Sequence, residues 1–250
     1  MTRWQFYFEH SLIGYFSRRA REKWFTPPYV PPKELDYHGV KLQLDCLPPG
    51  MQQLILDGKY ETSELDLLSK MLVPTDNVLE IGGAIGFIGL YCHKVLNVKN
   101  VVSVEPNPQT LSYFKRNYEL NGMTPAIIEA AVAQTDGPIT FFANDMFWGD
   151  SLIQPSQGAG STTTITVAGL SFNSLLQRAG TTFNVLIVDI EGAEQYLPVQ
   201  EIPASIKKVM LEIHPHVIGT RGAYGVLETL IRNGFQVAGN VKDCWALVRA

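Results

Sequence analysis

One segment, residues 78–105, limits the fold of this 250-residue chain more than any other. It begins with an apolar strand over 78–81 and passes through the glycine-rich turn Gly82-Gly83-Ala84-Ile85-Gly86 into a helical pattern over 86–96. It ends with a second apolar strand over 101–104. Two parallel strands need a crossover connection, which is usually a helix. The segment therefore predicts a βαβ unit and an α/β fold built on a parallel sheet.

Strand and helix patterns go on alternating along the rest of the chain. The run at 185–189 is apolar up to its final aspartate, as expected of a strand buried inside a parallel sheet. Thr62 or Ser63 is expected to cap the helix at 64–71. The other predicted strands are 40–44, 126–129, 139–142, 164–167, 209–213, 235–237 and 245–248, and the other predicted helices are 108–120, 171–177 and 225–233.

Residues 1–50 differ in composition from residues 51–250, which we assign to one α/β domain. They carry many aromatic side chains up to Phe16, then a basic run over 18–23 and a proline cluster over 27–32. This pattern is typical of an amphipathic helix with an extended connector. Three interpretations stay open: a helix that packs on the main domain or on a second copy of the chain, a lid over a substrate site, and a helix that lies on a membrane surface.

Composition and charge narrow the class of protein. With 46% hydrophobic and 18% charged residues, the chain can form a full core. Its net charge of −4 disfavours a dedicated nucleic-acid binder. The three cysteines include no CxxC pair, so they indicate neither a structural zinc site nor a disulfide framework and favour a reducing compartment. We find no apolar run of about 18 residues and no signal-peptide pattern, and therefore expect a cytoplasmic protein.

Acidic residues fall at the ends of the predicted core strands, where ligands bind in open α/β sheets. A dinucleotide site favours the spacing G-x-G-x-x-G, which holds a pyrophosphate at a helix N-terminus. Here the spacing is G-G-x-x-G, and Glu80 precedes the turn. A carboxylate there would repel a pyrophosphate but suits the cationic methionine end of S-adenosylmethionine. Glu105, after the next strand, suits the two ribose hydroxyls. Ala131 and Val132 are expected either to line an adenine slot or to pack in the core.

A second acidic group follows the strand at 185–189. Asp189, Glu191 and Glu194 lie within six residues and would repel one another unless each has a partner or a proton. Such clusters are more often functional than structural. Glu191 and Glu194 can instead face solvent or cap the next helix. A divalent metal is a rival use of the cluster, because magnesium and calcium prefer oxygen ligands.

The next strand ends in Glu212-Ile213-His214, and strand alternation places Glu212 and His214 on one face. Histidine is the usual general base near neutral pH, so we expect His214 to act in chemistry beside Asp189 and Glu191. The segment 143–163, which is rich in small and polar residues around two aromatic side chains, is a long loop of the kind that often covers a site.

Taken together, these motifs resemble the FkbM-type S-adenosylmethionine-dependent methyltransferases. The resemblance runs from about residue 55 to 240 and is carried by the segments 58–61, 78–86, 104–108, 189–194 and 211–215. It implies a Rossmann-like sheet of seven strands, mostly parallel with the last strand antiparallel, with helices on both faces. It also implies methyl transfer, mostly to oxygen, on sugars or secondary metabolites. Two features depart from the family pattern. Glu80 and Gly83-Ala84 replace the usual aspartate and G-A-N-x-G turn, and Ile187 stands where a lysine is common.

The residue patterns and the resemblance together assign roles to individual positions. We expect His214, Asp189 and Glu191 to be catalytic. The expected cofactor contacts are Tyr60, Glu61, Glu80, Gly82, Gly83, Ala84, Gly86, Glu105, Pro106, Asn107, Ala131, Val132 and Asp189. The expected substrate contacts are Phe147, Trp148, Ser151, Glu191, Glu212 and His214.

The first hypothesis is an O-methyltransferase in which His214, aided by Asp189 or Glu191, removes the proton of an acceptor hydroxyl. The acceptor would be a small molecule with a sugar, polyketide, peptide or lipid hydroxyl, whereas nucleic acid is disfavoured. A metal-assisted methyltransferase with Asp189, Glu191 or Glu212 as ligands is the second hypothesis. A catalytically silent binding protein on the same fold is the third, and a nucleotide-dependent oxidoreductase is disfavoured by the glycine spacing. A homo-oligomer would form through the N-terminal helix.

Overall fold

The computed structural model describes residues 31–144 and 162–249. The chain divides into two compact units, Met1–Pro32 and Lys33–Ala250, and almost all of the first lies outside the described residues. The predicted N-terminal helix therefore lies outside them too, as do Phe147, Trp148 and Ser151. The second unit begins at Lys33, so it includes a hairpin that the sequence placed in the N-terminal extension.

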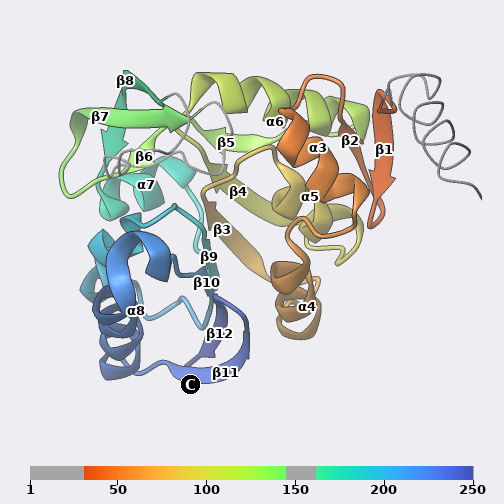
Figure 1. Cartoon of the computed structure of the whole chain (residues 1–250). Helices are drawn as coiled ribbons and strands as arrows, with labels where there is room; N and C mark the ends of the chain where they lie inside the picture. The colour runs from red at the N-terminus through yellow and green to blue at the C-terminus, as the bar shows by residue number, and fades with distance from the viewer. Residues whose placement is uncertain (1–30, 145–161, 250) are drawn as a thin grey trace, which may run out of the picture. The chain divides into compact units, whose positions relative to one another are not determined.

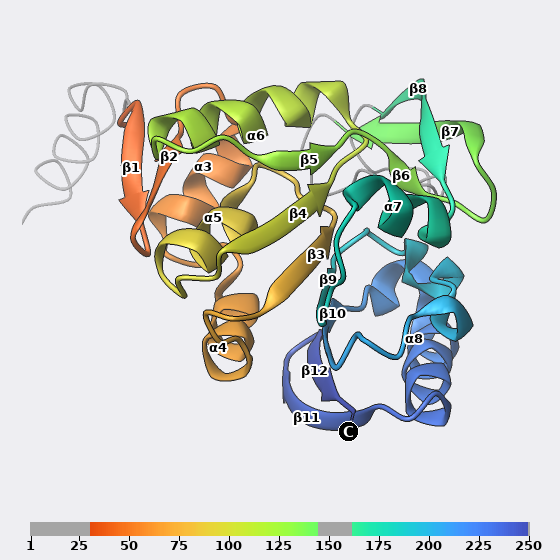
Figure 2. The same cartoon turned by 180° about the vertical axis from the view of Figure 1, so that it is seen from behind.

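A seven-stranded sheet forms the centre of the second unit, with the strand order β11-β12-β10-β9-β3-β4-β5 (Figures 1 and 2). Its strands are β11 (Gln236–Val241), β12 (Cys244–Val248), β10 (Lys208–Glu212), β9 (Val185–Val188), β3 (Asn77–Ile81), β4 (Asn100–Val104) and β5 (Ala126–Ile128). The pairs from β10 to β5 are parallel, and β12 runs antiparallel to both of its neighbours. The predicted α/β fold with a mostly parallel seven-strand sheet and an antiparallel last strand is confirmed.

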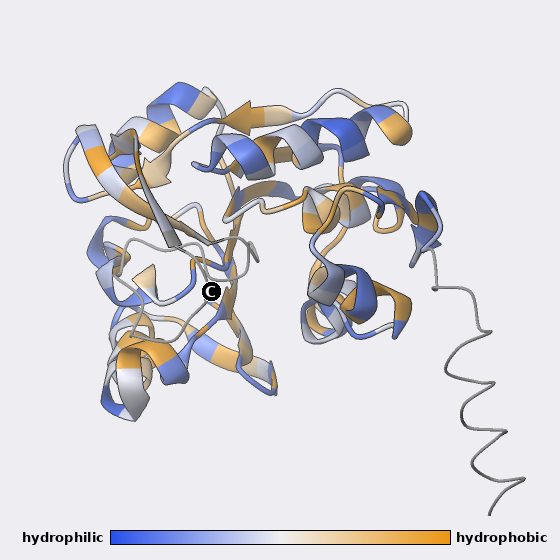
Figure 3. Ribbon diagram, turned by 45° about the horizontal axis from the view of Figure 1, so that its top comes forward, coloured by the Kyte–Doolittle hydropathy of each residue, from blue (hydrophilic) through white to orange (hydrophobic). Residues whose placement is uncertain are grey.

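Helices cover both faces of this sheet because successive strand residues point to opposite sides. Val78 and Ile187 pack in one core with α3 (Pro49–Leu56), α4 (Thr62–Met71), α5 (Phe87–Lys94) and α6 (Pro108–Leu120). Leu79 and Leu186 pack in the other core with α7 (Phe172–Ala179) and α8 (Pro215–Arg232). Figure 3 shows that the helices around the sheet carry both hydrophobic and hydrophilic stretches, as amphipathic helices do.

Two smaller sheets complete the described part of the chain. The strands β1 (Glu34–Tyr37) and β2 (Val40–Gln43) form an antiparallel hairpin. The strands β6 (Ala131–Val132), β8 (Thr162–Leu170) and β7 (Gly137–Asn144) form a separate three-stranded sheet in that order. The sequence predicted strands within β7 and β8 but not their separation from the main sheet. Two 3₁₀ helices, η1 (Ala193–Tyr196) and η2 (Val199–Glu201), follow β9.

Several boundaries differ from the predictions for identifiable reasons. Helix α8 starts at Pro215, well before the predicted residue 225, and a left-handed Gly219 with φ 72° interrupts it. Glycines disfavour helix, which is why the sequence pointed to the later start. Helix α4 is capped by the left-handed Glu61 with φ 54°, without a side-chain hydrogen bond, so neither Thr62 nor Ser63 is the cap.

In the part of the chain that the structure describes, we find no helix with the length and apolar character needed to cross a membrane. Cys46, Cys92 and Cys244 are all free thiols.

Candidate active site

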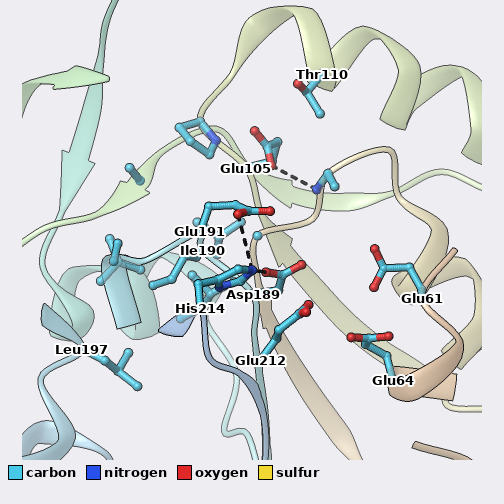
Figure 4. A pocket seen from close by; sticks show the side chains of 18 of the residues that line it. Glu61, Glu64, Glu105, Thr110, Asp189, Ile190, Glu191, Leu197, Glu212 and His214 are labelled. Carbon is cyan, nitrogen blue, oxygen red and sulfur yellow. Dashed lines mark hydrogen bonds and ion pairs between the residues drawn. The ribbon is translucent and has the colours of Figure 1, made fainter. Parts of the chain in front are cut away.

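A cavity of about 660 Å³ opens at the carboxyl ends of β3, β4, β9 and β10. This is where ligands bind in open α/β sheets, and the volume is in the range of small-molecule sites. Figure 4 shows Asp189, Glu191 and His214 close together, with Glu212 beside them. The side chains of Glu61 and Glu64 extend toward the same space from α4 and its N-terminal end.

The glycine-rich turn after β3 forms one edge of the cavity. Gly82 has φ 94°, and a Cβ at this position would lie 1.7 Å from the carbonyl oxygen of Asp189. Only glycine fits there, because the turn packs directly against the chain that leaves β9. Gly82 and Ala84 line the cavity, but Gly83 packs against Phe114 and Gly86 begins α5, so neither lines it.

Glu105, which follows the end of β4, lines the cavity and also contacts the glycine-rich turn. It is 5% exposed and accepts hydrogen bonds from the backbone amides of Ala84 at 3.0 Å and Asn107 at 2.8 Å. Pro106 also lines the cavity. The side chain of Asn107 does not, because its Oδ1 atom caps α6 by accepting from the Gln109 amide at 2.9 Å. The two amides fix the Glu105 carboxylate at the cavity wall.

The structure corrects the expected role of Glu80. Its carboxylate is 2% exposed, accepts a hydrogen bond from Ser103 Oγ, and is not part of the cavity lining. Burial raises the pKa of this carboxyl to about 7, against the opposing hydrogen bonds from Ser103 and the Gly89 amide. Strand alternation directs Glu80 under α5, whereas Ile81, the last residue of β3, reaches the cavity. Glu80 therefore contacts Ser103 and α5 and lies outside the cavity lining.

An apolar wall lies on the side of the small sheet. Ala131 and Val132 of β6 line the cavity as expected. Ile139 and Phe141 of β7 join them, which the sequence did not predict. These two residues are two positions apart in a strand, so their side chains lie on the same face. This alternation could have predicted from the sequence that they line the cavity together. The wall suits a flat apolar ring system.

Four carboxylates from different elements meet on the opposite side, at the ends of α4, β9 and β10. They belong to Glu61, Glu64, Asp189 and Glu212, and all line the cavity. Burial, with the nearby charges of Asp189 and Glu64, raises the pKa of Glu212 to about 9. Burial likewise raises the pKa of Glu61 well above its ordinary value. A bound cation would favour the ionised forms of these carboxyl groups, so the cluster suits a positively charged ligand.

Glu64 is a site residue that the sequence analysis missed. It is 4% exposed, and its Oε1 accepts from the Cys244 thiol at 2.6 Å. Leu67 and Leu68, three and four residues later, lie on the buried face of α4. Helical periodicity places Glu64 on that same face and could have identified it. The contribution of Cys244, 180 residues away, had no comparable signal.

His214 lies at the centre of a cluster of carboxylates. It is 6% exposed, and its Nδ1 lies 2.8 Å from Glu194 Oε1. Its Nε2 lies 3.4 Å from Glu191 Oε2 and 3.6 Å from Asp189 Oδ1. Burial alone would lower the pKa of His214, but the hydrogen bond to Glu194 and the charges of Asp189 and Glu191 outweigh it and raise the pKa to about 10. The imidazole is therefore protonated at neutral pH.

This protonation state bears on the proton chemistry of the cluster. Burial raises the pKa of Asp189 to about 6, against the opposing positive charge of His214. Asp189 is thus an ionised carboxylate at neutral pH, next to an imidazolium. Ligand atoms of Asp189, Glu212 and His214 lie within 4.8 Å of one another. Both nitrogens of His214 already face carboxylates, so the arrangement is an ion-pair cluster.

Comparison with protein families gives a match that covers part of this site. Residues 80–199 match the family model of the methyltransferase FkbM domain. This segment is similar to FkbM methyltransferase domains. The resemblance predicted from the sequence is confirmed there. Within the FkbM segment lie the glycine turn, Glu105, Asp189 and Glu191, whereas Glu212 and His214 lie beyond it.

Solved structures similar to this chain are distant. The ribosomal protein L11 methylase of Lactobacillus delbrueckii subsp. bulgaricus is 13% identical with a TM-score of 0.49, over 77% of this chain and 80% of that one. Methyltransferase FkbM of Methylobacillus flagellatus KT is 14% identical with a TM-score of 0.43, over 72% of this chain and 45% of that one. A methyltransferase of Pyrococcus furiosus is 14% identical with a TM-score of 0.43, over 94% and 93%. Among curated proteins there is no match. These distant similarities carry no conclusion about function.

The structure brings most of the predicted site residues together and leaves a few apart. Those that line the cavity are Tyr60, Glu61, Gly82, Ala84, Glu105, Pro106, Ala131, Val132, Asp189, Glu191, Glu212 and His214. Those that do not line it are Glu80, Gly83, Gly86 and Asn107.

Proposed function

We propose that this chain is an S-adenosylmethionine-dependent O-methyltransferase that acts on a hydroxyl of a sugar-like or secondary-metabolite-like small molecule. The observation that carries the proposal is that Asp189, Glu191 and His214 open into the same cavity as Glu105. One end of the cavity thus has the carboxylate that suits a ribose, and the other has the groups that accept a proton. The FkbM domain over 80–199 supports methyl transfer as the reaction.

The residues present fit S-adenosylmethionine. Glu105, oriented by two backbone amides, suits the paired ribose hydroxyls. The wall that contains Ala131, Val132 and Phe141 suits the adenine ring. The carboxyl groups of Glu61 and Glu64 suit the cationic methionine end, because a cation beside Glu61 would favour its ionised form against the burial that raises its pKa. When bound, this cofactor supplies a methyl group on a positively charged sulfur.

Proton removal from the acceptor is the task of the cluster around His214. Since the imidazole already carries its proton at neutral pH, the proposed acceptor of the hydroxyl proton is the carboxylate of Asp189 or Glu191, and His214 holds both as anions. This changes the role expected from the sequence, where the imidazole itself was the base. In the transfer, the bond between the methyl carbon and the sulfur would break as the new C–O bond forms, S-adenosylhomocysteine would leave, and the hydroxyl proton would pass to a carboxylate oxygen of Asp189 or Glu191. Alignment of the two reactants supplies much of the remaining acceleration.

The acceptor would lie against Glu191, Glu212 and His214. Phe147, Trp148 and Ser151 remain predicted substrate contacts. A small molecule with a free hydroxyl suits a cavity of about 660 Å³, and nucleic acid stays disfavoured by the net charge of −4. A cytoplasmic location and a homo-oligomer formed through the N-terminal helix likewise remain predictions.

Product analysis tests this proposal directly. The full chain is incubated with methyl-labelled S-adenosylmethionine and a panel of hydroxylated and amine-bearing small molecules, and the products are identified by mass spectrometry and NMR. We expect label on oxygen, and about a hundredth of it or less with the Asp189→Asn variant in the same time. Label found only on nitrogen or carbon would contradict the O-methyl assignment. Failure of S-adenosylhomocysteine to bind in calorimetry would contradict the cofactor assignment.

A further inference from the structure

Glu194 is a buried carboxylate behind His214 that the proposed reaction does not use. It is 1% exposed and does not line the cavity. Its Oε1 accepts from the Gly192 amide at 2.9 Å and lies 2.8 Å from His214 Nδ1. Its Oε2 is buried and has no hydrogen-bond partner among the described residues. A buried carboxylate of this kind is costly unless a positive charge accompanies it, and His214 is the cation beside it.

The backbone between β9 and η1 places two carboxylates on opposite sides of the imidazole. Glu191 has φ 48° and Gly192 has φ 93°, so two successive residues adopt left-handed conformations. This is uncommon for a glutamate. The resulting turn brings Glu194 to Nδ1, while Glu191 reaches Nε2 at 3.4 Å. Two glutamates three residues apart, Glu191 and Glu194, therefore contact the two nitrogens of the imidazole ring.

The charged and titratable groups around the ring come from three parts of the fold. The segment after β9 contributes Asp189, Glu191 and Glu194, which face the two ring nitrogens. Strand β10 ends with Glu212, whose charge interacts with that of His214. Helix α8 contributes His216, whose ring centroid lies 5.6 Å from that of His214. Of these groups, Glu194 alone hydrogen-bonds the ring nitrogen that points away from Asp189 and Glu191.

We propose that Glu194 is a positioning residue for proton transfer: by accepting a hydrogen bond from Nδ1–H of His214, it orients Nε2–H toward Asp189 and Glu191 at the cavity. The carboxylate fixes both the orientation and the charge of the ring, because a negatively charged acceptor stabilises the imidazolium. A partner of this type sets which ring nitrogen carries a proton and where the other one points. The effect on rate rests on the proposed function, whereas the effect on His214 does not.

The test is the Glu194→Gln variant of the full chain, which keeps the shape of the side chain and an acceptor oxygen for the Gly192 amide but removes the negative charge. We expect the pKa of His214, followed by NMR of the labelled imidazole, to fall by roughly one unit or more. S-adenosylhomocysteine should bind by calorimetry with an unchanged Kd. The rate of methyl transfer should fall by about tenfold or more, and its pH profile should shift, whereas Glu194→Asp should restore part of both.

Glu228→Gln is the matched control, since it removes the same charge from an exposed glutamate that pairs with Arg232 on α8. It should leave the His214 titration unchanged. An unchanged His214 pKa in Glu194→Gln would overturn the proposal. If that variant does not fold, the wild-type protein still decides, because a neutral His214 ring at pH 7 would overturn it and a doubly protonated ring would support it. If O-methyl transfer is absent while His214 titrates as stated, the proposed function fails and the positioning role stands.

Discussion

At one end of the cavity Glu105 is held by two backbone amides, whereas at the other end Asp189, Glu191 and His214 are held by one another. Backbone amide donors do not titrate, so these two contacts do not depend on the protonation of a neighbouring side chain. The second end is a set of coupled charges whose geometry depends on which groups carry protons. Under the proposed function, Glu105 belongs to a recognition end of the cavity, and Asp189, Glu191 and His214 form a proton-handling end that responds to pH.

The largest expected effect comes from Asp189→Asn. This change removes the proposed proton acceptor while keeping its shape. We expect kcat for methyl transfer to fall by about two to four orders of magnitude, which is the usual contribution of a general base. S-adenosylhomocysteine binding, measured by calorimetry, should change little. A variant with near wild-type kcat would break the distinction between the two ends.

Glu105→Gln is expected to have a smaller effect, and to weaken cofactor binding more than it lowers kcat. The amide replaces one acceptor oxygen by a donor group, and a hydrogen bond to a charged group contributes about 1.5–3 kcal/mol. The Kd for S-adenosylhomocysteine should therefore rise by about 10- to 100-fold, while kcat at saturating cofactor falls much less. If kcat falls as steeply as in Asp189→Asn and the Kd is unchanged, the roles of the two ends would be reversed.

The pH dependence of kcat/KM sharpens the comparison further. Burial raises the pKa of Asp189 to about 6, and a protonated carboxyl cannot accept the hydroxyl proton. We expect kcat/KM of the wild-type enzyme to fall by about tenfold per pH unit below this value. Glu105→Gln should keep the same acidic limb, because its carboxylate lies at the other end. If the acidic limb of the kcat/KM profile shifts in Glu105→Gln, the protonation of the two ends is coupled.

The smallest effect concerns stability. The pKa of Glu212 is raised to about 9, so the folded chain binds a proton that the unfolded chain releases near pH 4.5. The free energy of unfolding without ligands should therefore fall as the pH rises between these values. His214, with its pKa raised to about 10, contributes stability that is full below about pH 6.5 and is lost as the pH rises toward 10. Urea unfolding of Glu212→Gln should show a shallower decline than the wild type, and an equal slope would contradict the assigned shift.

The sequence predicted the fold well because strand and helix periods follow directly from which faces are buried. It predicted Glu105, Asp189 and His214 as site residues because each follows the end of a core strand, and all three line the cavity. Glu80 was misplaced because its position near a strand end was weighed above strand alternation, which directs it under α5. The sequence left Glu194 open between a functional role and a place that faces solvent or caps a helix, and the left-handed turn at Glu191 and Gly192 accounts for its burial. Contacts such as Cys244 with Glu64 depend on long-range packing, which no local pattern encodes.

The close contact at Gly82 has a consequence for altering this protein. Its missing side chain lets the turn after β3 rest on the carbonyl of Asp189, and the Asp189 amide in turn donates to Ile81 at 2.9 Å. This seam sets the distance between the recognition end and the proton-handling end without any adjustable side chain. Redesign of the acceptor preference can therefore vary the outer walls freely, whereas even a single methyl group at residue 82 would move the two halves of the site apart.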